Sequence, residues 1–301
     1  MKVAAIDVGT NTALLTIAEG ERAIVERAEI VRLGEGLDKS GRLKDEAIAR
    51  TVAVVAEFAE AIAKHGCARV AAVTTEAVRK AANGGDFVAR ASEALARVGG
   101  RMQVIDGERE ARLSWLAVAG SFPSLTGPRT VLDIGGGSTE LIVGEREVEA
   151  VVSLPIGSVR LTERIVAHDP PTYEEAVHLA TTIDEALANA PAPRGTLVGI
   201  AGTVTTLAAM AQRLDSYDAE RVHGSSLTLA DVDALAAMLA TTPLADKRRT
   251  PGLDPKRADV IYAGAVILAR VMARAGVDSC IVSDRGIRWG LIYEMTRTQG
   301  D

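Results

Sequence analysis

The chain has 301 residues, enough for two domains of ordinary size or one large one. Hydrophobic residues make up 48% and charged residues 25%, a globular balance that predicts a substantial core. The net charge of −6 argues against a general nucleic-acid binder, which would carry a basic surface. Aromatic residues are only 3%, so Ala, Val, Leu and Ile must build the core, which favours packed α/β layers over an aromatic-rich sandwich.

The cysteines and the N-terminus indicate a cytoplasmic protein. Cys67 and Cys280 each lie in or beside an apolar stretch, which is typical of reduced, buried thiols, with a disulfide as the weaker alternative. No secretory signal follows Met1, and no window approaches the ~18 consecutive apolar residues of a spanning helix. We therefore expect a soluble, cytoplasmic protein.

Strand and helix patterns alternate along the chain. Residues 120–129, which contain Pro123, Gly127 and Pro128, have the composition of a connection between domains. The alternation predicts an α/β fold with domains at 1–122 and 123–301, whose last helix could pack back on the first domain. The expected elements are strands at 3–6, 14–17, 70–73, 102–105 and 130–132, helices at 43–65, 75–82 and 108–119, a turn at 83–85, and strand-to-helix units at 197–214 and 279–298.

The strongest signal is an internal repeat. One apolar strand ends at Asp7, with a glycine two residues later, then a hydroxyl residue and a second apolar strand. The same order recurs at Asp133, which is 133 − 7 = 126 residues further on, about one domain length. Two similar halves that face each other would bring two acidic, glycine-rich turns to one cleft. We therefore expect a duplicated fold with the active site between its halves.

Both turns have the composition of a phosphate-binding loop. Glycines let the backbone approach a ligand and present N–H groups as an anion nest, and hydroxyl groups add donors. A carboxylate beside such a nest repels phosphate directly, so Asp7 and Asp133 are predicted to hold Mg²⁺. The alternative is a pair of hairpin turns with polar tips, which the matched copies make less favoured. The residues concerned are Gly9, Thr10 and Thr12 in the first turn and Gly135, Gly136, Gly137, Ser138 and Thr139 in the second.

Glu110 and Arg79 are candidates for the catalytic groups. Glu110 follows the turn Asp106–Gly107 and opens a helix, where a carboxylate is electrostatically favourable whatever its function. Arg79 lies on the helix after the strand 70–73, where it could meet a phosphoryl group or simply be solvated. Spacing alone favours the structural role for both residues.

Other turns and clusters carry weaker signals. Gly202 and Thr203 form a turn between a strand and an apolar helix that is equally a substrate-binding loop or a tight connection. The segment 283–286 has the same placement and the same two interpretations. Basic runs at 247–249 and 256–257 could track a long anion, although such runs are usually solvated. The four histidines have no metal-ligand spacing, and neither a P-loop nor a Ser-His-Asp arrangement is present.

Taken together, these residues resemble the Ppx/GppA phosphatase family, within the superfamily of actin-like ATPases, sugar kinases and Hsp70. The resemblance covers nearly the full chain, and its motifs in this order are highly specific. It implies an α/β fold of duplicated actin-like ATPase (ribonuclease H-like) domains with an inter-domain active-site cleft. The motifs are AIDVGTNTALL at 5–15, VRLGEGL at 31–37, TEAVR at 75–79, IDGEREARL at 105–113, LDIGGGSTEL at 132–141, GS at 157–158, GT at 202–203 and SDRGIRWGL at 283–291.

The resemblance also implies an activity and its residues. Members of the family release terminal phosphate from inorganic polyphosphate or the 5′ γ-phosphate from guanosine pentaphosphate. By this resemblance Glu110 matches the catalytic base, Arg79 a phosphate-contacting arginine and Asp133 the acid of the metal- and phosphate-binding loop. The first phosphate loop matches Asp7, Gly9, Thr10 and Asn11.

The chain departs from the family pattern at several positions. Thr10 and Thr12 replace serines but keep the hydroxyl group, and Glu76 stands where serine is common. Arg109 replaces one of the usual acidic residues beside Glu110. The chain ends soon after the second domain, so we expect no C-terminal helical extension, and therefore short-chain or less processive action.

From the sequence we expect an exopolyphosphatase that uses Mg²⁺ or Mn²⁺. Glu110 would deprotonate water, cations on Asp7 and Asp133 would neutralise phosphate oxygens, and Arg79 with the glycine N–H groups would stabilise the transferring charge. The alternatives are a guanosine pentaphosphate 5′-phosphohydrolase, a non-hydrolytic actin-like nucleotide-binding regulator and, less favoured, a sugar kinase. We expect neither a nucleic-acid nor a membrane partner, and the family suggests a homodimer.

Overall fold

A computed structural model describes residues 1–297 and divides the chain into two compact α/β units. Unit 1 comprises Met1–Gly120 and the helix that follows Gly286, and unit 2 comprises Ser121–Arg285. The predicted α/β class is confirmed. The predicted domain limits, 1–122 and 123–301, stay a prediction, and residues 298–301 at the end of the last predicted segment lie outside the described residues.

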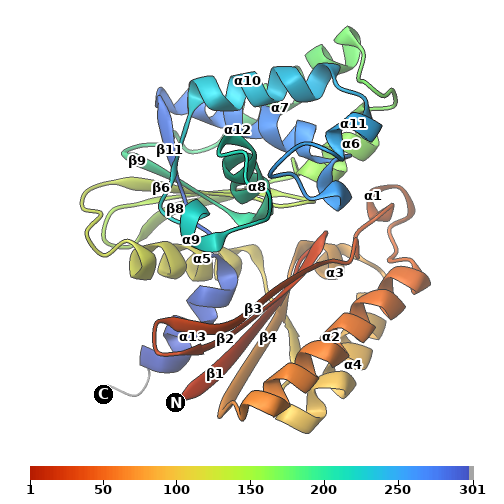
Figure 1. Cartoon of the computed structure of the whole chain (residues 1–301), viewed down its shortest axis with the longest axis vertical. Helices are drawn as coiled ribbons and strands as arrows, with labels where there is room; N and C mark the ends of the chain where they lie inside the picture. The colour runs from red at the N-terminus through yellow and green to blue at the C-terminus, as the bar shows by residue number, and fades with distance from the viewer. Residues whose placement is uncertain (298–301) are drawn as a thin grey trace. The chain divides into compact units, whose positions relative to one another are not determined.

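Unit 1 is built on a five-stranded mixed sheet in the order β3-β2-β1-β4-β5 (Figure 1). The central strand β1 pairs antiparallel with β2 and parallel with β4, and β4 pairs parallel with β5. Parallel neighbours need a crossover, which the helices between them provide. The strands are β1 (Lys2–Val8), β2 (Thr12–Glu19), β3 (Arg22–Ile30), β4 (Arg69–Thr74) and β5 (Met102–Val104).

Helices cover both faces of this sheet because β1 is apolar on both sides. Side chains alternate between faces along a strand. Ala4 and Ile6 pack in one cluster with α2 and α4, whereas Val3 and Ala5 pack in another with α5 and α13. The helices are α1 (Leu37–Ser40), α2 (Asp45–His65), α3 (Glu76–Lys80), α4 (Gly84–Leu95) with a 3₁₀ turn (Ala96–Val98), α5 (Gly107–Ser121) and α13 (Ile287–Arg297).

Sequence patterns located the longest element of unit 1 well and one neighbour badly. The helix expected at 43–65 runs from Asp45 to His65, and Gly66 ends it in the left-handed region with φ 62°. The turn expected at 83–85 is wrong, because Gly84 begins α4. Asn83 exchanges two hydrogen bonds with the backbone of Leu43, and a Cβ on Gly84 would lie 2.2 Å from the Val78 carbonyl oxygen. This glycine therefore serves close packing between α3 and α4.

Unit 2 repeats the same strand connectivity in a six-stranded sheet, in the order β10-β11-β9-β6-β7-β8. Strand β6 pairs antiparallel with β7 and parallel with β9, as β1 does with β2 and β4. The predicted duplication is therefore confirmed, with β10 as an additional edge strand in unit 2. The strands are β6 (Arg129–Ile134), β7 (Thr139–Gly144), β8 (Val148–Leu154), β9 (Thr196–Ile200), β10 (Ser226–Thr228) and β11 (Ser279–Val282).

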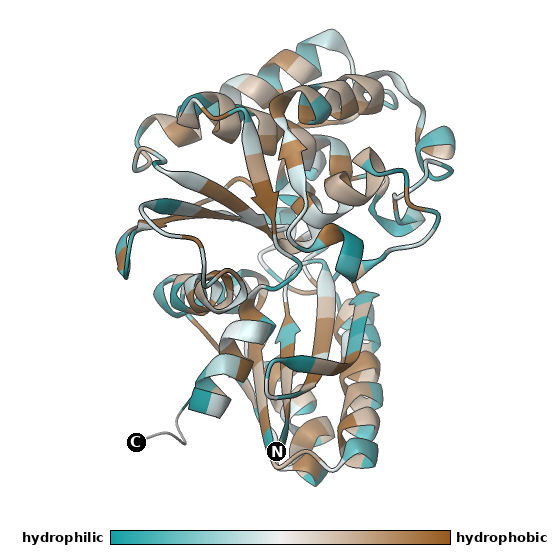
Figure 2. Ribbon diagram, turned by 60° about the vertical axis from the view of Figure 1, so that its left-hand side comes forward, coloured by the Kyte–Doolittle hydropathy of each residue, from teal (hydrophilic) through white to brown (hydrophobic). Residues whose placement is uncertain are grey.

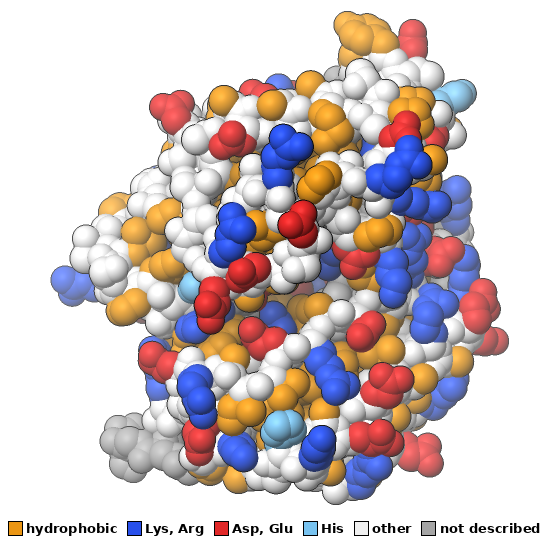
Figure 3. Space-filling view, viewed as in Figure 1, with side chains coloured by type: hydrophobic (Ala, Val, Ile, Leu, Met, Phe, Trp, Pro, Cys, Tyr) orange, Lys and Arg blue, Asp and Glu red, His pale blue; other side chains and the backbone are white. Residues whose placement is uncertain are grey.

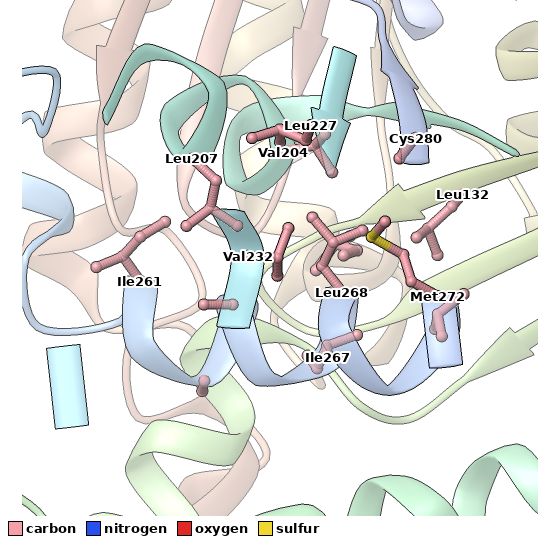
Figure 4. Packing of buried hydrophobic residues seen from close by; sticks show 14 of the residues in the cluster. Leu132, Val204, Leu207, Leu227, Val232, Ile261, Ile267, Leu268, Met272 and Cys280 are labelled. Atoms are coloured by element: carbon pink, nitrogen blue, oxygen red, sulfur yellow. The ribbon is translucent and has the colours of Figure 1, made fainter. Parts of the chain in front are cut away.

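The core of unit 2 lies between its sheet and a layer of helices. Figure 4 shows Leu268 and Met272 of α12 pointing toward Val204 of α8 and Leu132 of β6. In the ribbon coloured by hydropathy, hydrophobic colour runs along the strands (Figure 2). The helices are α6 (Ser158–Ile165), α7 (Tyr173–Ala188), α8 (Ala201–Ala211), α9 (Ala219–Val222), α10 (Leu229–Thr241), α11 (Leu244–Lys247), a 3₁₀ turn (Pro255–Arg257) and α12 (Ile261–Ala275).

Both cysteines are free thiols, as the sequence predicted. Cys280 is buried, which raises the pKa of its thiol to about 12, whereas Cys67 is only half-buried. Within residues 1–297, we find no helix with both the length and the apolar composition to cross a membrane.

Candidate active site

The two predicted turns have the same backbone geometry. In unit 1 the Gly9 N–H donates to the Thr12 carbonyl at 3.0 Å, and in unit 2 the Gly135 N–H donates to the Ser138 carbonyl at 2.9 Å. Both donors and both acceptors are 126 residues apart, the offset that separates Asp7 from Asp133. The sequence repeat is thus a repeat of local structure down to a single hydrogen bond.

In each turn, carbonyl oxygens accept hydrogen bonds from a neighbouring segment of the same unit. The Gly34 N–H donates to the Thr10 carbonyl at 2.8 Å, and the Arg160 N–H donates to the Gly136 carbonyl at 3.0 Å, again at an offset of 126. Among the described residues, no group accepts from the N–H of Gly136 or Gly137. The second turn therefore has its acceptors used and its donors available, which is the polarity of an anion nest.

Glycine is required where the supporting segment meets the second turn. A Cβ on Gly157 would lie 2.4 Å from the Gly136 carbonyl oxygen, so only glycine lets the start of α6 approach. Arg160, on the first turn of α6, is buried and donates from its guanidinium to the Gly137 carbonyl. The motif at 157–158 thus has a packing role that the sequence alone did not reveal.

Asp7 is a buried carboxylate on the face of the sheet that α5 and α13 cover. It follows Val3 and Ala5 in the strand alternation, and the residue is 9% exposed. Its Oδ1 has no hydrogen-bond partner among the described residues. Burial raises the pKa of Asp7 to about 6, and the positive charge of Arg288 on α13 partly offsets this. A carboxylate in this position would be stabilised by a cation.

Arg79 and Glu110 meet at the carboxyl end of the parallel strands in unit 1. Thr74, the last residue of β4, pairs with Val8 on one side and Val104 on the other, so β1, β4 and β5 end level. Arg79 lies on α3, which follows β4, and Glu110 lies on α5, which follows β5. Ligands bind at this edge of open α/β sheets.

The geometry of this pair is compact. Arg79 Nη1 donates to the Ile105 carbonyl at 2.6 Å and lies 3.7 Å from Glu110 Oε2. The Glu110 side chain is 8% exposed and that of Arg79 is 30% exposed. Arg79 is therefore held by protein contacts at the carboxylate rather than extended into solvent.

Helix α5 is locked to α13. A Cβ on Gly290 of α13 would lie 2.2 Å from the Leu113 carbonyl oxygen, so the two helices touch backbone to backbone. Arg109 and Glu294 form a two-pronged ion pair between them. Glu110, the neighbour of Arg109, thus lies on a helix whose first turn is anchored from outside.

The carboxylates of the two turns fit a divalent cation whose remaining ligands come from water and substrate. Within residues 1–297 no group of three or more His, Cys, Asp and Glu side chains forms a ready-made metal cage. Mg²⁺ typically takes one or two carboxylates and fills its other positions with water and phosphate oxygens. Asp7 and Asp133, each buried at the end of its central strand, provide carboxylates of that kind. Their metal-binding role, and the meeting of the two turns, stay predictions.

The third turn is closely packed. Ala201 has φ 68°, and a Cβ on Gly202 would lie 2.3 Å from the Arg257 guanidinium. Thr203 is buried, and a Cβ on Gly264 would meet its methyl group at 2.4 Å. These contacts explain the turn as a tight connection, and substrate binding by Gly202 and Thr203 stays a prediction.

The basic run at 247–249 is not one solvated patch. Lys247 is buried, and burial lowers the pKa of its amino group, while Arg248 and Arg249 are exposed. On the face shown in Figure 3, basic and acidic side chains are interspersed. A long anion would therefore meet local basic groups rather than a surface of uniform sign.

Sequence reasoning assigned no role to Arg160 and Arg288, two buried arginines. Both lie in or beside recognised motifs, but their functions depend on contacts between distant segments. Arg288 donates to the Leu15 carbonyl at 3.5 Å and faces the charge of Asp7. An arginine inside a run of apolar helix residues was the available signal.

The fold and these turns define a class of duplicated α/β proteins with an acidic, glycine-rich turn after the central strand of each unit. The model of the Ppx/GppA phosphatase family matches residues 15–299. The chain belongs to the Ppx/GppA phosphatase family, which confirms the resemblance seen in its motifs and the prediction of a hydrolase.

Named proteins are similar to this chain over nearly its full length. Exopolyphosphatase 2 of Mycobacterium tuberculosis is 40% identical over 313 residues, which cover 98% of each chain. Exopolyphosphatase 1 of Mycobacterium leprae is 30% identical and covers 100% of this chain and 91% of its own.

Solved structures agree with the fold. The Aquifex aeolicus member of the Ppx/GppA family has a TM-score of 0.85 at 36% identity, over 100% of this chain and 99% of that one. An exopolyphosphatase from Cytophaga hutchinsonii has a TM-score of 0.90 at 28% identity, over 99% and 98%.

Proposed function

We propose that the protein is an exopolyphosphatase that releases orthophosphate from the end of inorganic polyphosphate. The observation that carries this proposal is the Arg79–Glu110 pair at the carboxyl edge of unit 1, beside a phosphate-type turn that unit 2 repeats. The full-length similarity to proteins named exopolyphosphatase supports the choice of substrate.

Glu110 is the base in this proposal. It accepts a proton from water as the water oxygen bonds to the terminal phosphorus. The bond from that phosphorus to the bridging oxygen breaks, and its electron pair stays with the shortened chain. Glu110 is buried, so few waters compete for its proton-accepting oxygens.

Arg79 and the two turns stabilise the negative charge of the transferring phosphoryl group in this proposal. Arg79 is fixed by the Ile105 carbonyl, so its guanidinium is oriented before substrate binds. In unit 2 the N–H groups of Gly136 and Gly137 are assigned to phosphate oxygens, and in unit 1 the side chains of Thr10 and Asn11 add donors. Phosphoryl transfer depends mainly on such positioning.

Asp7 and Asp133 are the carboxylates assigned to a divalent cation. When bound, Mg²⁺ or Mn²⁺ supplies charge neutralisation to the phosphate oxygens. The unpaired Oδ1 of Asp7 and its raised pKa support this assignment for unit 1. The net charge of −6 makes local cations necessary, because an acidic protein repels polyphosphate at long range.

Phosphate release should be compared for polyphosphate, guanosine pentaphosphate and ATP, each with Mg²⁺, with Mn²⁺ and with a chelator. We expect the highest kcat/KM for polyphosphate, complete loss of turnover in chelator, and a KM that rises with ionic strength. Faster release from guanosine pentaphosphate would instead favour the alternative function, a guanosine pentaphosphate 5′-phosphohydrolase. Undiminished turnover in chelator would remove the cation role of both aspartates.

A further inference from the structure

A pocket of about 570 Å³ lies in unit 1, and Arg79 forms part of its wall. It is formed by the end of α3, the first turns of α4 and the edge strand β5. Its walls include Val78, Val88 and Val104, so much of its surface is apolar. The mechanism proposed above makes no use of it.

The ionisable side chains that line the pocket are both positive. Among the described residues that form its walls, Arg79 and Arg101 carry charge and no carboxylate is present. Ser92 also lines it and retains a hydroxyl proton, because its oxygen accepts from the Met102 N–H at 3.2 Å. A small anion therefore meets two guanidinium groups and a hydroxyl donor here.

Arg79 belongs both to this pocket and to the catalytic pair, since it lies 3.7 Å from Glu110. In an in-line displacement the attacking water and the leaving oxygen lie on opposite sides of the phosphorus. The base is on the water side, and so the freed phosphate forms on the side of Glu110 while the shortened chain lies on the other. Arg79, which lines the pocket, is thus also the neighbour of the group beside which the small product forms.

We propose that this pocket receives the orthophosphate released in each turnover, with Arg79 as the residue shared with the catalytic pair and Arg101 as the residue that holds the phosphate. The inference rests on the proposed hydrolysis and adds a separate product site to it. Two like charges suit a doubly charged phosphate, whereas the polymer remains with the turns. Phosphate bound there should act as a product inhibitor.

The test is the charge reversal Arg101→Glu, with Arg90→Glu as the matched control. Arg90 lies on α4, is exposed and does not line the pocket. Calorimetric titration with inorganic phosphate should show binding to the wild type that weakens about fivefold or more in Arg101→Glu and is unchanged in Arg90→Glu. The inhibition constant for added phosphate should rise by the same factor.

A rapid-quench measurement of the first turnover separates product binding from chemistry. We expect Arg101→Glu to keep the first-turnover rate within about twofold, because no bond is made in the pocket. Equal phosphate affinity in Arg101→Glu and wild type, or no phosphate binding to the wild type, would overturn the inference. The inference would also be overturned if Arg101→Glu slowed the first turnover by the same factor by which it weakened phosphate binding. Absence of polyphosphate hydrolysis with phosphate binding still dependent on Arg101 would instead refute the proposed function alone.

Discussion

In unit 1 the turn after β1 is supported by a loop at residues 31–34, in which Arg32 has a φ of 49°, whereas in unit 2 the turn after β6 is supported by the first turn of α6. The hydrogen bond within each turn is the same. In unit 1 a Cβ on Gly34 of that loop would lie 2.4 Å from the side-chain methyl group of Thr10, whereas in unit 2 a Cβ on Gly157 would lie 2.4 Å from the backbone carbonyl oxygen of Gly136. Duplication thus kept the turn and allowed its surroundings to differ.

That difference separates two tasks. Unit 1 places two buried carboxylates and a guanidinium group at the edge of its sheet, those of Asp7, Glu110 and Arg79. In unit 2 one such carboxylate, Asp133, lies beside a turn of three consecutive glycines that presents backbone donors. We infer that residues of unit 1 carry out the proton transfer and that the turn of unit 2 binds phosphate. Three comparisons test this division, from the largest expected effect to the smallest.

The largest effect is on stability, at Asp7. Its pKa in the folded protein, about 6, exceeds the ordinary 3.8, so the folded state binds the proton more tightly than the unfolded state. The contribution of Asp7 to stability is therefore fully present below about pH 4 and is lost as pH rises through about 6. The cost above that range is about 3 kcal/mol for a shift of about two pKa units.

Asp7→Asn should remove this cost. In cation-free buffer we expect the free energy of unfolding at pH 7 to rise by up to about 3 kcal/mol, with no gain at pH 3.5. Urea unfolding at both pH values measures this. A variant that is equally or less stable at pH 7 would show that Asp7 carries no burial cost, and the contrast between the units would weaken.

The second effect compares Gly9 with Gly135. A Cβ on Gly9 would lie 3.7 Å from the Thr12 carbonyl oxygen, an ordinary contact, whereas on Gly135 it would lie 3.1 Å from the Ser138 carbonyl oxygen. Gly9→Ala should therefore fold with a free energy of unfolding within about 0.5 kcal/mol of the wild type, and Gly135→Ala should lose about 1 kcal/mol.

Gly9→Ala should nevertheless lower kcat/KM for polyphosphate about tenfold, because a methyl group displaces phosphate from the backbone. Steady-state phosphate release and thermal unfolding on the same preparation give both values. Full activity in Gly9→Ala would mean that the turn of unit 1 does not touch substrate.

The smallest effect concerns the anchor of α5. Arg109→Gln breaks the ion pair with Glu294 and should lower kcat about threefold at unchanged KM, because Glu110 loses part of its positioning. The matched control is Arg112→Gln on the same helix, whose ion pair with Glu108 is more exposed. Equal kcat in the two variants would show that the Arg109–Glu294 pair does not position Glu110.

The sequence predicted what repeats locally and missed what depends on distant contacts. The offset of 126 led directly to the duplicated fold, and the helix at 43–65 followed from apolar spacing and Gly66. Strand β3 was not predicted, because none of its residues is fully buried and charged residues interrupt its apolar ones. Helix α4 was missed because Gly84 signals a turn unless the Val78 carbonyl beside it is known.

For the site, residue types were readable but their partners were not. Glycines after a strand-end aspartate indicate an anion nest from sequence alone. The 3.7 Å approach of Arg79 to Glu110 joins segments that lie 31 residues apart and needs the level ends of β4 and β5. Arg160 and Arg288 could not be assigned, because the backbone and side-chain groups that they contact come from other strands and turns.

The central claim is that Glu110 deprotonates the attacking water, and the variant Glu110→Gln tests it most directly. Orthophosphate release from polyphosphate, measured under saturating Mg²⁺, should fall about 10²–10⁴-fold in kcat, because the amide keeps the shape but cannot accept the proton. Polyphosphate affinity and the melting temperature should stay close to wild type. A kcat within about twofold of wild type would contradict the account.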